Sequence, residues 1–301
     1  MPGNQTTIVL LGTLLLGVAA GLVGTFAVLR KRALVGDVVA HAALPGLCLA
    51  YLLFESRSIL VLLAGALASG VLGACCVSGL KKVTRLQDDA VLGIVLSVFY
   101  GGGIALTRSI QNNYRDEQVD LESFIIGRAA TMLRGDVLQI AAVVVVATLL
   151  VVLLFKELKL VSFDEQFCRV QGWSSTGLDG LLMLLTAVTV IVGLPAVGVV
   201  LTAALLIIPA AAARFWTDRL SRMMMIACGF GGLSGVVGTL ISAEFDGLPT
   251  GPLIVLTAAV IFVASWLLAP HRGILFRGKA ELDTSLLPWL ADDASSDTGV
   301  R

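Results

Sequence analysis

The chain has 301 residues, of which 57% are apolar and only 14% are charged, and its formal net charge is zero. Soluble domains usually carry about 25% charged residues, so this composition excludes an ordinary water-soluble protein and indicates that lipid is the solvent. A balanced charge gives no reason to expect a nucleic-acid partner, and only the placement of Lys and Arg is informative.

Apolar runs of roughly 17 to 23 residues, long enough to cross about 30 Å of hydrocarbon as helices, occur in nine places. In chain order they cover residues 8–29, 33–53, 58–79, 89–107, 136–155, 178–194, 196–213, 223–243 and 251–269. The sixth and seventh runs meet at Gly193, Leu194 and Pro195, where two spans joined by a minimal turn are hard to tell from one broken helix. We therefore predict an all-α, polytopic integral membrane protein with eight or nine transmembrane helices. Residues 1–269 form its transmembrane domain, and 270–301 form a cytoplasmic tail whose end is expected to be disordered.

Basic residues concentrate in alternate connections between these runs. They are Arg30, Lys31 and Arg32; Lys81, Lys82 and Arg85; Lys156, Lys159 and Arg169; Arg214, Arg219 and Arg222; and Arg272, Arg277 and Lys279. The other connections are short or acidic, as in the stretch 116–122. Because short cytoplasmic loops are enriched in Lys and Arg, this alternation predicts nine spans, with the N-terminus outside and the C-terminus inside.

Small residues recur at four-residue spacing in two of the runs, Gly17 with Gly21 and Gly231 with Gly235. This spacing places them on one helix face and predicts closely packed helices. The five cysteines have no CxxC or Cys/His zinc spacing, so we interpret them as packing residues.

Gly36–Gly46, with the sequence GDVVAHAALPG, places an acid and a histidine inside the second apolar run. Asp37 and His41 are four residues apart, so they share a helix face and form a plausible half-site for a divalent transition metal. Pro45 lacks an N–H and, with Gly46, predicts a helix break beside the pair. The alternative is that Asp37 lies at the membrane interface and that a neutral His41 bonds to a neighbouring helix. The residues alone leave both interpretations open.

The segment GDVVAHAALPG resembles the signature of permeases from ABC-type manganese, zinc and iron uptake systems, with Ala40 in place of the usual serine. Four further blocks resemble that family in the same order, and the resemblance covers about residues 7 to 276. They are TRLQDDAVLGIVLSVFYGGG (84–103), VSFDEQFCRVQG (161–172), VGVVLTAALLIIPAAAARFWTDRL (197–220) and LPTGPLIVL (248–256).

The resemblance implies a membrane permease subunit that moves Mn, Zn or Fe into the cytoplasm, without a permanently bound cofactor, in a bacterial plasma (inner) membrane. It implies that Asp37 and His41 bind or gate the ion along its path. It also implies that Phe163, Asp164, Glu165 and Gly172 belong to a coupling helix that docks on an ATPase, although Gln166 and Cys168 depart from the family pattern. The alternative for this segment is an amphipathic helix lying on the membrane.

Three partners follow from the same resemblance: a cytosolic ATPase subunit that uses the ATP, an extracytoplasmic metal-binding protein, and a second permease, identical or paralogous. Residues 273–280, GILFRGKA, fit GxxxxGK but lack the final Ser or Thr and follow an apolar helix, so we expect no phosphate loop there. We therefore expect a transport subunit rather than an enzyme. An ATP-independent secondary transporter or channel for metal ions is the alternative function, since it shares this composition and polar pair.

Overall fold

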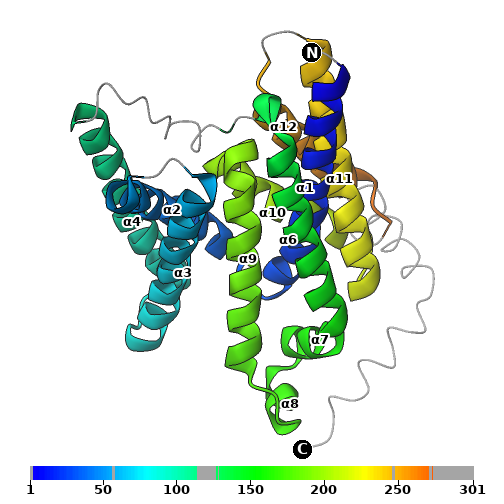
Figure 1. Cartoon of the computed structure of the whole chain (residues 1–301). Coiled ribbons are helices and arrows are strands. Elements are labelled where there is room, and N and C mark those ends of the chain that lie inside the picture. Colours follow the sequence, from blue (N-terminus) through cyan, green and yellow to red (C-terminus); the bar gives the residue numbers. More distant parts are fainter. Residues whose placement is uncertain are drawn as a thin grey trace, which may run out of the picture.

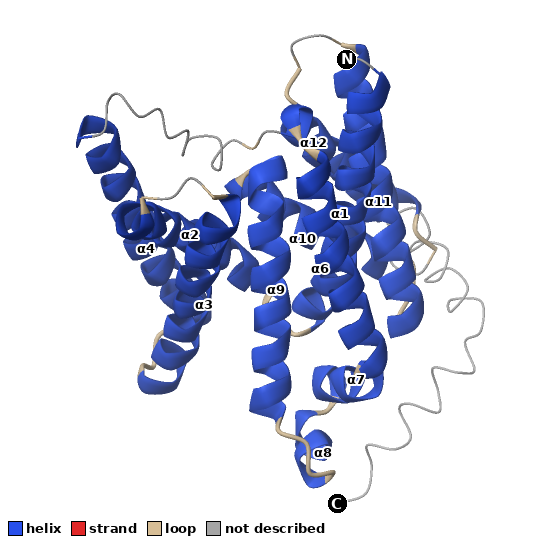
Figure 2. Cartoon of the chain, viewed as in Figure 1, coloured by secondary structure: helices blue, strands red, loops and turns tan. Residues whose placement is uncertain are grey.

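The computed structural model describes residues 3–55, 58–113, 127, 129–245, 248–270 and 273, and the regular elements in these ranges are all helices (Figure 2). In chain order they are α1 (Gly3–Leu29), α2 (Ala33–Phe54), α3 (Ile59–Val83), α4 (Asp88–Asn113), the 3-10 helix η1 (Ala129–Thr131), α6 (Arg134–Leu153), α7 (Phe155–Phe163), α8 (Glu165–Val170), α9 (Ser175–Val197), α10 (Val199–Arg214), α11 (Leu220–Glu244) and α12 (Thr250–Leu268). Eight of these helices are long and apolar enough to cross a membrane, and α10 is a shorter apolar helix. The predicted all-α polytopic membrane fold is confirmed. The acidic stretch 116–122, the GxxxxGK match and most of the C-terminal tail lie outside the described residues.

The helices form two groups joined through α9 and α10. One group contains α2, α3 and α4, and the other contains α1, α6, α11 and α12 (Figure 1). Helix α9 contacts α2 and α3 in the first group and α1 and α6 in the second, while α10 contacts α1, α2, α11 and α12. The short helices α7 and α8 lie at the end of the bundle opposite the N-terminus (Figure 1).

Helices α1 and α11 cross with their backbones in direct contact. A Cβ atom added to Gly17 would collide with the carbonyl of Gly231, and one added to Gly235 would collide with the carbonyl of Thr13. The Thr13 hydroxyl lies 2.9 Å from the Thr239 hydroxyl across this seam. The close packing predicted from the glycine spacing is therefore confirmed, since only small residues permit this approach.

The junction between the sixth and seventh apolar runs lies later than the sequence analysis placed it. Helix α9 continues through Gly193 and Pro195 to Val197, and the chain turns at Gly198, whose φ is +92°. Glycine adopts this left-handed conformation without a steric penalty, whereas Pro195 remains within the last turn of α9. Gly198, which can adopt the left-handed conformation, therefore determines where α9 ends, and Pro195, which lacks an N–H, does not.

Candidate functional site

The α2 pair, which we define as Asp37 and His41, is connected by two contacts within one turn of helix. The Nδ1 atom of His41 lies 3.3 Å from Oδ1 of Asp37 and 2.9 Å from the backbone carbonyl oxygen of Asp37. The structure therefore brings together the acid and the imidazole that the sequence placed on one face.

The backbone contact defines which nitrogen of His41 is available to a ligand. A carbonyl oxygen can only accept a hydrogen bond, so Nδ1 must be the protonated nitrogen that donates to Asp37. In the neutral ring Nε2 then carries the lone pair. Metal-binding histidines commonly use this arrangement, in which one ring nitrogen is held by a carboxylate or carbonyl and the other binds the ion.

The α2 pair lies on a stripe of α2 that the other described helices cover only in part. The Asp37 side chain is 34% exposed and the His41 side chain 13%. Leu34 and Leu49, which continue the same face, are 49% and 47% exposed. An ionisable pair that faces away from its own bundle requires either a water-filled path or another protein surface, because facing lipid is costly.

Helix α4 packs against α2 beside the pair. The ring of Tyr100 meets His41 edge to face, with 5.0 Å between ring centroids. One turn later Gly103 leaves room for the ring of Pro45, and Thr107 lies 3.3 Å from the Cys48 sulfur. Sequence analysis did not single out Tyr100, although the block 84–103 contains it, because nothing in the sequence gives the register of α4 on α2.

Helix α2 does not end at Pro45 and Gly46, where the sequence predicts a helix break or kink, and it continues through both residues. The proline removes one hydrogen bond from the helix and leaves its continuity intact. Gly46 has a packing role instead, since a Cβ there would collide with the carbonyl of Gly65 in α3.

The described part of one copy does not bring together a complete set of metal ligands. Within the described residues, no group of three or more His, Cys, Asp or Glu side chains comes together. The α2 pair alone would supply two protein ligands, which are fewer than a divalent transition ion normally takes.

The predicted coupling segment forms the short helix α8. The Asp164 side chain accepts a hydrogen bond from the Phe167 backbone N–H at 2.8 Å, which caps the helix N-terminus as its residue type predicts. Gly172 follows the helix with a φ of +85°, whereas Phe163 ends α7 and is 59% exposed. A hydrogen bond from Arg169 lowers the pKa of the Glu165 carboxyl.

Sequence analysis missed a group of charges near α8. The Arg30 cluster, as we define it, consists of Arg30, Arg32, Glu165 and Asp179. Nη2 of Arg30 lies 2.5 Å from Oδ1 of Asp179, and both side chains are only 12% exposed. An acid within the apolar run 178–194 was the available signal, because a buried carboxylate requires a partner.

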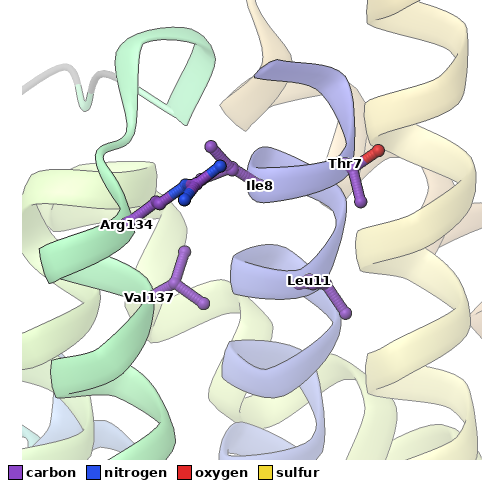
Figure 3. Close-up of a pocket in the computed structure, with 5 residues that line it drawn as sticks. All are labelled: Thr7, Ile8, Leu11, Arg134 and Val137. Atoms are coloured by element: carbon purple, nitrogen blue, oxygen red, sulfur yellow. The ribbon is translucent and has the colours of Figure 1, made fainter. Parts of the chain in front are cut away.

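A groove between α1 and α6 lies near the N-terminal end of the bundle and has a volume of about 320 Å³. Figure 3 shows Arg134 extending from α6 towards Ile8 of α1, with Leu11 and Val137 below. The lining residues contain no carboxylate or imidazole, and the guanidinium would repel a metal cation. This groove is therefore not a competing ion site.

The bundle of apolar helices and its ionisable pair define a polytopic membrane transport protein. The model of one family, the ABC 3 transport family, matches residues 4–269. The chain belongs to this family.

Similar proteins include transport subunits with different named metals. The chain is 46% identical to the zinc transport system membrane protein TroC of Treponema pallidum over 89% of this chain and 90% of that protein. It is 45% identical to the manganese transport system membrane protein MntC of Bacillus subtilis over 90% of this chain, but spans only 62% of that relative's length. The solved structure of PsaBC from Streptococcus pneumoniae in complex with Fab has a TM-score of 0.78 and 31% identity, covering 88% of this chain and 92% of that one.

Proposed function

We propose that this chain is the permease subunit of an ATP-driven importer that moves a divalent transition metal ion, Mn, Zn or Fe, into the cytoplasm. The observation that carries the proposal is the α2 pair, whose Nε2 lone pair and second carboxylate oxygen remain available on a partly uncovered face of a membrane helix. The names of the similar transport proteins support the same substrate class.

Metal uptake by conservative variants tests this assignment. Asp37→Asn and His41→Gln keep side-chain size and hydrogen bonding but remove the charge or the imidazole ligand. We expect both to lose uptake of Mn²⁺ at limiting metal, at matched expression. Val145→Ala, on an exposed face of α6, is the control and should transport normally. Full uptake by both site variants would contradict the proposed role of the pair.

The permease works as a dimer, with itself or with a paralogous permease. Two α2 pairs facing each other would supply four protein ligands, with water completing the coordination shell. The partly covered stripe of α2 supports this arrangement, since a second copy would complete the site and shield the ionisable groups from lipid. Cross-linking of Leu34→Cys between copies is expected, whereas Val145→Cys, on an exposed face of α6, should not cross-link.

A cytosolic ATPase provides the energy, and an extracytoplasmic binding protein delivers the ion. Helix α8, with its Asp164 cap and exposed Phe167, is the surface we assign to the ATPase, together with the exposed Phe163 at the end of α7. Asp164→Lys or Gly172→Pro should reduce ATP-dependent uptake while leaving membrane insertion intact. Uptake that persists without the ATPase would instead favour a secondary transporter or channel.

In this arrangement the N-terminus lies outside and α8 lies in the cytoplasm. Their positions at opposite ends of the bundle agree with opposite sides of the membrane, and the direction rests on the alternation of basic connections. A cysteine reporter placed near Asn113 should react from outside, and one near Ser221 only after permeabilisation. The reverse labelling would overturn the orientation.

A further inference from the structure

The Arg30 cluster joins three parts of the fold that are distant in sequence. Arg30 follows α1 in the short connection to α2. Its Nη1 donates to the Val161 carbonyl of α7 at 2.6 Å, and its Nη2 donates to both carboxylate oxygens of Asp179 in α9, at 2.5 and 2.6 Å. One guanidinium therefore ties the corner between α1 and α2 to α7 and α9.

The same cluster reaches α8. Nη2 of Arg30 lies 3.8 Å from Oε2 of Glu165, the first residue of α8. Glu165 also pairs with Arg169, whose Nε donates to the Ser175 hydroxyl at the start of α9. Cys168, fully buried in the apolar cluster that contains Val161, fixes the other face of α8. A displacement of α8 would therefore act directly on the Arg30 guanidinium.

On its other side the cluster reaches α2. Arg32 immediately precedes this helix. Its backbone carbonyl accepts a hydrogen bond from the Val35 N–H at 3.0 Å, and its Nη2 donates to Oδ2 of Asp179 at 2.9 Å. Asp37 and His41 follow within the same uninterrupted helix. Because a helix moves as a stiff rod over such a short length, a shift of this corner moves the α2 pair.

Stability alone is a poor explanation for the cluster. A buried ion pair contributes little compared with apolar side chains of similar volume, because desolvation offsets much of the attraction. Beside the cluster a cavity of about 380 Å³, lined by residues including Arg32, Glu165 and Asp179, separates α8 from α3. Nε of Arg30 is buried and has no partner among the described residues. The cavity therefore gives the side chains of the cluster space to move, and Nε of Arg30 can donate a new hydrogen bond in a second arrangement of the cluster.

We propose that Arg30 and Asp179 are positioning residues that transmit a displacement of α8 to α2, and so link ATP hydrolysis to the exposure of the metal site. This inference rests on the proposed function, in which α8 contacts the ATPase and α2 holds the ion. The inference adds the Arg30–Asp179 pair as the connection between α8 and α2.

The test uses a variant that removes the charges without leaving either one unpaired. The double substitution Arg30→Met with Asp179→Leu should preserve folding, since it replaces the pair by apolar side chains. The permease and its ATPase are reconstituted in vesicles, and Mn²⁺ uptake and ATP hydrolysis are measured together. We expect Mn²⁺ moved per ATP to fall by about tenfold or more, while hydrolysis remains. Lys81→Gln, which breaks the Lys81–Asp88 pair away from α8, is the control and should leave this ratio unchanged.

Two further measurements separate coupling from structure. Mn²⁺ binding by the purified double variant should match the unmodified chain, because Asp37 and His41 are intact. Arg30→Lys, which keeps the charge, should give an intermediate ratio, because one ammonium cannot reproduce the fork that contacts Val161 and both oxygens of Asp179. This milder variant provides the test if the double variant fails to assemble.

An unchanged ratio in the double variant, or in Arg30→Lys if only that variant assembles, would overturn the inference and leave the proposed function intact. Loss of Mn²⁺ binding by the double variant would also overturn it, because the cluster would then shape the site rather than couple it. If the unmodified complex showed no ATP-dependent Mn²⁺ uptake, the proposed function itself would fail, and the inference with it.

Discussion

The α2 pair and the Arg30 cluster both place ionisable groups within an apolar bundle, but they differ in how completely their charges are satisfied. Asp179 receives hydrogen bonds from two arginines and is almost buried. Within the described residues, the Asp37 side chain pairs with its own helix neighbour His41, and it is 34% exposed. The charges of the Arg30 cluster satisfy one another and hold helices in place. The α2 pair leaves ligand atoms available to bind a group from outside the chain. Breaking one member of each should therefore have opposite consequences.

The largest expected effect is that of Asp179→Leu. This substitution leaves Arg30 buried without its counter-ion, so we expect the free energy of unfolding to fall by about 3–5 kcal/mol. Thermal unfolding of the purified protein in detergent measures the change. The double variant with Arg30→Met should recover most of the loss, and failure to recover would mean that the hydrogen bond between Arg32 and Asp179 accounts for much of it.

The matching change in the open pair, Asp37→Asn, should leave thermal unfolding nearly unchanged, because the carboxylate has no cation to strand. The Asp37 carbonyl still holds Nδ1 of His41, so the imidazole keeps its orientation. Affinity for Mn²⁺ should nevertheless fall by about 100-fold or more, because the proposed ligand loses its charge, and even groups that only support metal ligands usually contribute about 10- to 100-fold. Titration of the purified dimer checks this, and an unstable variant with normal affinity would contradict the distinction between the two regions.

A smaller effect is expected at the edge of the cluster. Asp164→Ala removes the side-chain cap of α8 and should cost about 1 kcal/mol, confined to this short helix. Hydrogen exchange of the α8 amides should accelerate while that of α2 stays constant. Asp164→Asn or Asp164→Ser, which keep capping ability, should restore protection.

The smallest effect concerns pH. The hydrogen bond from Arg169 lowers the pKa of Glu165, so its contribution to stability is fully present above the ordinary Glu pKa and is lost as pH falls through the lowered value. Attachment of α8 should therefore be constant at neutral pH and weaken only in acid. Glu165→Gln should remove this dependence in hydrogen exchange measured across the same range, and an equal dependence in both proteins would place the titrating group elsewhere.

Patterns that are local in the sequence predicted most of the transmembrane helices and the α2 pair, but they did not predict the Arg30 cluster. The lengths of apolar runs indicated the spans. The spacing of Gly17 with Gly21 and of Gly231 with Gly235 indicated two closely packing helix faces, but not that the two faces meet. The α2 pair was evident because its two members are four residues apart. Each of these signals lies within one helix.

Interactions between distant segments were not predictable in this way. Arg30 and Asp179 are 149 residues apart, and nothing in either neighbourhood identifies the other. The sequence analysis interpreted Arg30 and Arg32 only as markers of membrane orientation, although both donate hydrogen bonds to Asp179. The turn between α9 and α10 was predicted a few residues too early for a related reason. The sequence shows several residues at which a helix can end, but the backbone dihedral angles in the folded chain determine that it ends at Gly198.

The hydrogen bond from His41 to the Asp37 carbonyl also has a consequence for the rate at which an ion would bind in the proposed site. Because the helix backbone itself orients the ring, an arriving ion finds Nε2 already in place and loses little time to rearrangement. In the proposed site, one imidazole and one carboxylate from each copy would hold the ion with few ligands and release it readily once the path opens. Passage requires binding that is strong enough to admit an ion and weak enough to release it. A third strong ligand beside His41, such as Tyr100→His, would lengthen the residence time and slow turnover while raising affinity.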